Sequence, residues 1–146
     1  MSRCRLMVVD DDPAVRQVLR DFIELFVDEC EIVAEATNGR DAVRLAVEND
    51  PDVILMDIRM PLEDGIQATR RIKLDFRLRA VVVTFTTYVW NEIQQEAYRA
   101  GASLHLPKPF DLERLKSVLR QAHQLARDSS PAARDSRPGI AASLST

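Results

Sequence analysis

The sequence predicts an α/β fold, in which helices flank a parallel β-sheet. Five short apolar segments alternate with segments whose apolar residues recur at three- and four-residue steps, a pattern typical of parallel sheets with helical crossovers. The third apolar segment, residues 53–57, is almost uniformly apolar, as expected of a strand that is buried on both faces. Capping residues between the segments predict where the helices begin and end.

The predicted strands cover residues 6–9, 32–34, 53–57, 80–85 and about 103–106. Asp12 is expected to cap the first helix, with Pro13 at its first position. Asp50-Pro51 should end the second helix, because the residue before a proline disfavours helical geometry. The third helix is expected to run through Leu74, and Gly101 to end the fourth helix in a left-handed conformation.

The helices and the end of the chain suggest one domain with a tail. An apolar stripe of the first helix should pack on the sheet; its members are Val15, Val18, Leu19, Phe22, Ile23 and Phe26. The last helix begins near Asp111, and residues 1–127 are expected to form a single domain. Residues 128–146 are rich in Ser, Ala, Pro and Arg and contain no aromatic residue, so we expect a disordered tail there.

The charge balance argues against direct nucleic-acid binding. Twenty Lys and Arg residues against 23 Asp and Glu leave a net charge of −3, with no basic excess to neutralise phosphates. The apolar runs are too short to span a membrane, and the start of the chain lacks the apolar segment of a secretory signal. We therefore expect a cytoplasmic protein in which Cys4 and Cys30 are reduced thiols, rather than a disulfide or a zinc site.

Charged side chains stand at the ends of three predicted strands. Asp10 and Asp11 follow the first strand and Asp57 ends the third, while Lys108 follows the fifth. Because the carboxyl ends of parallel strands meet at one edge of a sheet, we expect these groups to lie together. Three close carboxylates repel one another unless a cation or shared protons relieve the repulsion, and oxygen ligands of this kind suit Mg²⁺.

A lysine opposite such a metal would hold an anion between two positive charges, and a phosphoryl group is the simplest candidate. Asp57 would then be the nucleophile, forming an acyl phosphate. A hydroxyl from Thr84 or Thr86, on the fourth strand, would hydrogen-bond a phosphoryl oxygen. Taken one by one, the acid pair could be a helix cap, Asp57 a turn residue and Lys108 an exposed loop charge. Their coincidence at one edge of the sheet favours a site.

Three motifs of the chain resemble those of response regulator receiver domains. Val8-Val9-Asp10-Asp11 is similar to the acid pair of that family, and residues 53–61 are similar to its phosphorylation site. Pro107-Lys108-Pro109-Phe110 is similar to its lysine motif, and Gly65 and residues 100–103 add to a resemblance that covers roughly residues 4 to 126. It implies a flavodoxin-like, five-stranded parallel sheet of order 2-1-3-4-5 with five flanking helices.

The resemblance also implies roles for the site residues. Asp57 would accept the phosphoryl group, and Asp57 and Asp11 would bind Mg²⁺ directly. Asp10 would act on the metal through water, and the backbone carbonyl of Arg59 would be a further ligand. Lys108 would pair with the phosphoryl oxygens, and Lys108-Pro109 is the candidate for a cis peptide bond.

Two positions are less constrained by the resemblance. Counting back from Gly101 by the family spacing selects Thr86 as the hydroxyl residue, with Thr84 as the second choice, because both lie on the same face of the strand. Members of the family also switch state through this hydroxyl and an aromatic ring three residues before the lysine. That place is held by His105, which is either a switch whose charge depends on pH or a surface residue.

The leading functional hypothesis is a stand-alone receiver, phosphorylated by a sensor histidine kinase or a phosphotransfer protein. Phosphorylation would alter the face of helix four, strand five and helix five, which would bind a downstream protein or a second copy of the chain. The alternative is the N-terminal receiver of a DNA-binding transcriptional regulator; a phosphate-independent binding module is a lesser one. We expect no enzyme activity beyond self-phosphorylation and self-dephosphorylation, because Arg59 occupies the place of the general acid in haloacid-type phosphatases.

Overall fold

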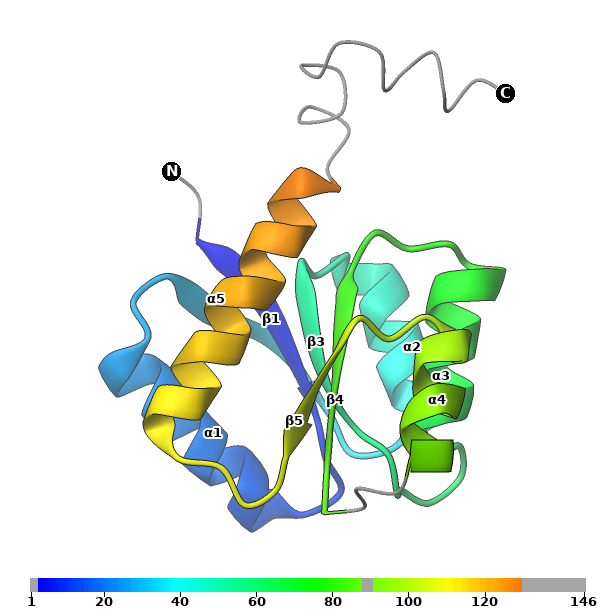
Figure 1. Ribbon diagram of the computed structural model, residues 1–146, viewed down its shortest axis with the longest axis horizontal. Coiled ribbons are helices and arrows are strands. Elements are labelled where there is room, and N and C mark those ends of the chain that lie inside the picture. The colour runs from blue at the N-terminus through cyan, green and yellow to red at the C-terminus, as the bar shows by residue number, and fades with distance from the viewer. Residues whose placement is uncertain (1–2, 88–90, 130–146) are drawn as a thin grey trace, which may run out of the picture.

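The computed structural model describes residues 3–87 and 91–129 (Figure 1). Its strands form one parallel sheet of order β2-β1-β3-β4-β5, which confirms the predicted flavodoxin-like fold. The strands are β1 (Cys4–Val9), β2 (Cys30–Ala36), β3 (Val53–Asp57), β4 (Val81–Thr86) and β5 (Leu104–Pro107).

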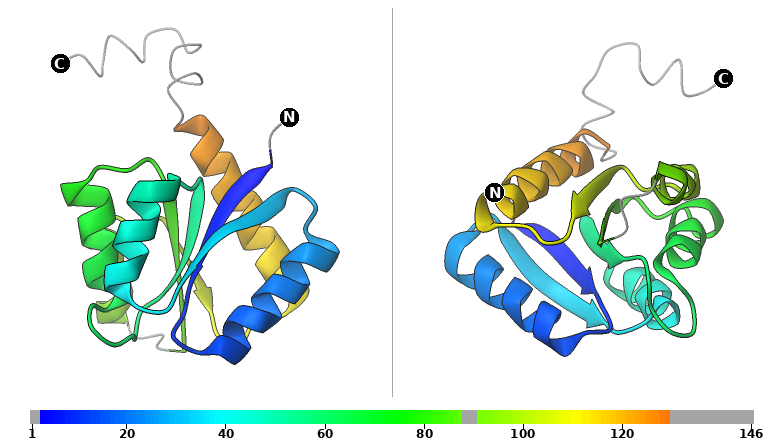
Figure 2. Two further views of the ribbon diagram at one scale, coloured as in Figure 1. Left: turned by 180° about the vertical axis from the view of Figure 1, so that it is seen from behind. Right: turned by 60° about the horizontal axis from the view of Figure 1, so that its bottom comes forward.

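Helices cover both faces of this sheet. They are α1 (Pro13–Phe26), α2 (Gly39–Asn49), α3 (Gly65–Arg70), η1 (Arg71–Asp75), α4 (Asn91–Ala100) and α5 (Leu112–Asp128). Figures 1 and 2 show α1 and α5 on one face, with α2, α3 and α4 on the other. Two cores follow from the alternation of strand side chains: Leu55 of β3 packs with α5 residues, whereas Ile54 and Met56 pack with α2.

The predicted helix ends are confirmed. The Asp12 carboxylate accepts a hydrogen bond from the Ala14 N–H at 2.9 Å, with Pro13 opening α1. Helix α2 ends at Asn49, followed by Asp50 in the left-handed conformation. Gly101 has a φ of 117° after α4, where a Cβ would also overlap the side chain of Lys73, so this position requires glycine.

The third helix differs from the expectation of one continuous α-helix. From Arg71 to Asp75 it is a π-helix, in which the Phe76 N–H donates to the Arg71 carbonyl at 2.9 Å. This wider turn holds one more residue than an α-helical turn, a change too local for hydrophobic periodicity to predict.

The first helix also differs from its prediction. Of the apolar stripe on α1, Leu19 and Ile23 are buried, whereas Val18 is 46% and Phe26 50% exposed. The stripe is wider than the face that touches the sheet, because a helix can bury only the side that its neighbours cover.

Three further expectations concern the end of the chain, the two cysteines and membrane-spanning helices. Helix α5 continues to Asp128, and residues 130–146 of the predicted tail lie outside the described residues. Cys4 and Cys30 are both buried and free. Within residues 3–87 and 91–129, no helix combines the length and apolar character that crossing a membrane requires.

Candidate functional site

Three carboxylates meet where β1 and β3 end, at the lower edge of the sheet in Figure 1. These strands are direct neighbours, with Val9 in register with Met56, so Asp57 comes to lie beside the acids that follow β1. One carboxylate oxygen from each of Asp10, Asp11 and Asp57 lies within 4.8 Å of the others. The structure thus brings together the three acids that the sequence predicted to meet.

Lys108 completes this cluster from the loop after β5. Its Nζ donates a hydrogen bond to Asp10 Oδ2 at 2.8 Å and lies 3.6 Å from Asp57 Oδ1. The ammonium also lies 4.5 Å from the centre of the Phe85 ring, a cation–π distance. The Lys108-Pro109 peptide is cis, as the resemblance implied. Sequence reasoning missed Phe85, because its apolar side chain fits an ordinary buried strand.

The two acids after β1 have different surroundings. Asp10 is 1% exposed, and its other oxygen, Oδ1, accepts a hydrogen bond from the Asp12 N–H at 2.8 Å. Arg16 on α1 donates to the Asp10 carbonyl at 2.7 Å, a contact that the sequence did not suggest. Asp11 is exposed. Asp10 is therefore held by the protein itself, whereas the Asp11 side chain faces solvent.

The surroundings of Asp57 shift its protonation equilibrium. The pKa of Asp57 is raised to about 6, first by burial and then by the charge of Asp10, while Lys108 opposes the shift. An ionised carboxylate in this position is therefore costly. A cation bound among the acids would lower that cost.

Gly65 allows the loop after β3 to close tightly over the site. A Cβ at this position would overlap the backbone carbonyl of Asp57 and the Cα of Ile58. The Gly65 N–H donates to the Ile58 carbonyl at 2.7 Å, and Asp64 caps α3 through a reciprocal bond with Gln67. The third helix thus begins directly behind Asp57. Arg59, in the same loop, is exposed.

The two candidate threonines have different neighbours, although both are 2% exposed. The Thr84 hydroxyl lies 2.9 Å from Nδ1 of His105 and is in register with Met56, one residue before Asp57. Thr86 ends β4, and its carbonyl accepts a hydrogen bond from the Lys108 N–H at 3.0 Å. Thr86 therefore lies next to Lys108 in the fold, whereas the Thr84 hydroxyl contacts His105.

His105 is turned into the protein rather than lying on the surface. Besides the contact with Thr84, its Nε2 is buried and has no hydrogen-bond partner among the described residues. Burial lowers the pKa of His105, because a charged imidazole would lose its hydration there.

An apolar groove of about 430 Å³ adjoins the acidic site. Its walls come from α1 and from the segments around Lys108; they are Ala14, Val15, Val18, Phe22, Thr87, Lys108, Pro109 and Phe110. The exposed part of the α1 stripe forms one wall. The periodicity of α1 predicted that this whole stripe packs on the sheet, because a periodic pattern does not distinguish a buried face from an exposed apolar one.

Comparison with known proteins gives a consistent result. The family model described as the response regulator receiver domain matches residues 6–120. The chain is 41% identical over 106 residues to the chemotaxis protein CheY of Halobacterium salinarum, covering 73% of this chain and 85% of CheY. It is 40% identical over 123 residues to the regulatory protein AtoC of Escherichia coli, covering 83% of this chain but only 25% of AtoC.

Solved structures show the same likeness. The signal receiver domain of the putative response regulator NarL from Mycobacterium tuberculosis superimposes with a TM-score of 0.80 at 26% identity. The superposition covers 85% of this chain and 98% of that domain.

Proposed function

Because the chain belongs to the response regulator receiver domain family, we propose that it accepts a phosphoryl group on Asp57 in a Mg²⁺-dependent reaction. The donor would be a sensor histidine kinase or a phosphotransfer protein. The observation that carries this proposal is the acidic cluster itself, with Lys108 between Asp10 and Asp57 and with Asp11 within reach of both.

The donor set suits Mg²⁺. Three carboxylates in close contact need a cation, and hard oxygen ligands favour Mg²⁺ over softer metals. Asp11 and Asp57 would hold the ion directly, Asp10 through water, and Arg59 through its backbone carbonyl. The ion would supply positive charge to the phosphoryl oxygens during transfer.

The transfer step itself needs only a nucleophile and charge stabilisation. An Asp57 oxygen attacks the phosphorus while the bond from phosphorus to the donor's histidine nitrogen breaks. Lys108 stabilises the charge on the transferred group, and the Thr86 hydroxyl donates to one of its oxygens. Such a protein catalyses only its own phosphorylation and dephosphorylation.

The apolar groove beside Lys108 supports docking of the donor. A donor has to bring its phosphohistidine to Asp57, and the groove offers apolar contact area around Lys108, whose ammonium lies close to Asp57. The apolar anchors that such a contact would use are Val18 on α1, which is exposed, and Phe110 after β5, which is partly buried.

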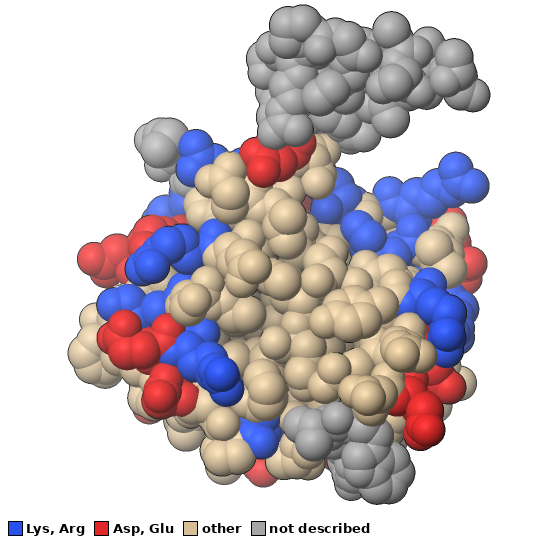
Figure 3. Space-filling view, in the orientation of Figure 1, with Lys and Arg blue, Asp and Glu red and all other residues tan. Residues whose placement is uncertain are grey.

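The output surface would be the face of α4, β5 and α5. Figure 3 shows this face, and the area over β5 carries few charged side chains, with Lys, Arg, Asp and Glu mostly around it. Low charge at the centre is typical of protein contact surfaces. His105 on β5 and Thr86 on β4 would couple this face to Asp57, and a downstream protein or a second copy would bind there. We infer that this occurs in the cytoplasm.

Intact mass spectrometry tests the proposal directly. The chain is incubated with acetyl phosphate, with Mg²⁺ or with EDTA. We expect a gain of about 80 Da, one phosphoryl group, that requires Mg²⁺ and disappears in Asp57→Asn. Asp75→Asn, an exposed aspartate away from the site, is the matched control and should be phosphorylated normally. Phosphorylation of Asp57→Asn would overturn the assignment.

A second candidate is that this receiver controls a DNA-binding output domain. The likeness to a solved DNA-binding response regulator from Staphylococcus aureus, at 27% identity and a TM-score of 0.76, supports it, and the match to the regulatory protein AtoC spans only a quarter of that protein. The reading frame in the source genome decides: continuation beyond Thr146 into a DNA-binding domain supports the candidate, and a stop codon there overturns it.

A further inference from the structure

The two cysteines lie side by side at the end of the sheet opposite the acidic site. Cys4 begins β1, Cys30 begins β2, and the two are register partners in this parallel pair. Adjacent strands run about 4.8 Å apart, and disulfides span Cα separations of roughly 4.4–6.8 Å. Both thiols are buried in the same core. The backbone therefore holds them at disulfide spacing.

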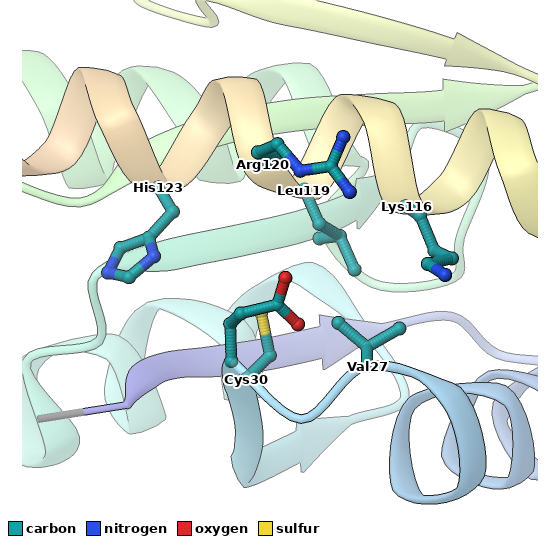
Figure 4. A pocket seen from close by; sticks show the side chains of 7 residues that line it. Val27, Cys30, Lys116, Leu119, Arg120 and His123 are labelled. Carbon is teal, nitrogen blue, oxygen red and sulfur yellow. The ribbon is translucent and has the colours of Figure 1, made fainter.

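A small cavity reaches Cys30 from the side of α5. Figure 4 shows Cys30 with its sulfur directed toward this helix, and Lys116, Arg120 and His123 projecting from the helix around the cavity. The volume open to the centre of a water-sized molecule is about 30 Å³, so the cavity has room for small molecules. Because Cys30 is only 2% exposed, a molecule as small as hydrogen peroxide can reach its sulfur, whereas a peptide thiol such as glutathione is too large to do so.

The two thiols are not equivalent. The hydrogen bond with Cys4 lowers the pKa of Cys30, and Arg3 lowers it further, against the opposing effects of burial and Glu29. The same contact with Cys30, followed by burial, raises the pKa of Cys4. Cys30, which lines the cavity, is thus the thiol that ionises first, and the thiolate is the reactive form.

We propose that Cys4 and Cys30 are a reversible redox site that a small peroxide oxidises to an intramolecular disulfide. The Cys30 thiolate attacks one peroxide oxygen, the O–O bond breaks, and the leaving oxygen departs as water after taking up a proton. Cys4 then loses its proton and attacks the Cys30 sulfur of the sulfenic acid, releasing a second water as the S–S bond forms. Two thiols lose two electrons in total and one peroxide is reduced to two waters.

The test uses the full chain, fully reduced, desalted and treated with hydrogen peroxide in native buffer before an acid quench. We expect a loss of about 2 Da, the two thiol hydrogens, restored by dithiothreitol. Non-reducing peptide mapping should join the peptides of Cys4 and Cys30. Oxidised glutathione under the same conditions should leave the mass unchanged, because the cavity excludes it; a mixed disulfide would overturn the small-oxidant assignment.

Single variants separate the two roles. Cys4→Ser should stop at a sulfenic acid on Cys30, a gain of about 16 Da, whereas Cys30→Ser should resist oxidation at least tenfold longer. The same reaction in guanidinium chloride is the matched control for the native fold. Oxidation only in the unfolded chain would overturn the proposal, as would equal reactivity of the two variants.

Discussion

Lys108 offsets part of the negative charge of the acidic site. Its ammonium donates to Asp10, which is almost fully buried, and lies close to Asp57. In this structure the lysine therefore pairs with the acids themselves. A phosphoryl group on Asp57 would compete with Asp10 for the same ammonium, so we expect phosphorylation to shift the position of Lys108.

Asp57→Asn is expected to stabilise the metal-free protein at neutral and higher pH. The folded-state pKa of Asp57 is raised from 3.8 to about 6, so its contribution to stability is present below pH 3.8 and is lost as pH rises through 6. The variant should gain about 2 kcal/mol at pH 8 and almost nothing near pH 4. Urea unfolding in EDTA at both pH values measures this, with Asp75→Asn as control. An equal gain at the two pH values would contradict the assigned cause.

Valine substitutions distinguish the two threonines at the end of β4. Thr86→Val removes the hydroxyl of the residue whose carbonyl accepts the Lys108 N–H and should slow phosphorylation by acetyl phosphate by about tenfold or more. Thr84→Val removes only the hydroxyl that contacts His105; it should leave the rate within about twofold and cost about 1 kcal/mol of stability. The time course of intact mass measures the rates. The opposite ranking would assign the phosphoryl contact to Thr84.

At the scale of elements, tight connections bring the site together. The β3–α3 loop returns to the backbone of Asp57 because Gly65 has no Cβ, and the capping box of Asp64 fixes where α3 begins. On the other side, the loop after β5 carries Lys108 to β4 through the Thr86 carbonyl. The distances in the site therefore depend on loop geometry as much as on the acids.

Gly65→Ala should damage both the fold and the site. The added methyl group would overlap backbone atoms, which cannot move aside as a flexible side chain can, so we expect a loss of about 2 kcal/mol or more and slower phosphorylation. Gly101→Ala, strained by its φ of 117° but remote from the acids, is the matched control. It should lose stability while its folded fraction is phosphorylated at the normal rate. Normal phosphorylation of folded Gly65→Ala would contradict this account.

At the scale of the whole molecule, two groups of reactive side chains lie at opposite ends of the sheet. The acids gather at the carboxyl ends of the strands, whereas the cysteines lie at the amino ends of β1 and β2. The two cores on either side of the sheet are both closed by described helices, and α5 completes one of them through Leu115, Leu119 and Ala122.

Truncation after Ser129 tests whether residues 3–129 are a complete domain. Because α5 ends at Asp128 and both cores lie within the described residues, the shortened chain should unfold within about 0.5 kcal/mol of the full chain. It should also gain a phosphoryl group at the same rate. Urea unfolding and intact mass measure the two properties, and a large loss of either would show that residues 130–146 contribute to the domain.

The sequence by itself determined the order of the elements and the three acids of the site. It could do so because both depend on local information: periodicity predicts strands and helices, and in a parallel sheet the carboxyl ends of the strands necessarily meet. The response regulator receiver motifs added the proposed roles of Asp57 and Lys108.

Only the tertiary structure decided the contacts that depend on packing between distant segments. The pairing of Lys108 with Asp10, the contact of Thr84 with His105 and the register of Cys4 with Cys30 each join different strands. The exposure of Val18 on α1 likewise depends on which neighbours cover the helix. Periodicity along one segment carries no information about lateral register or coverage, because these are set by the side chains of other segments.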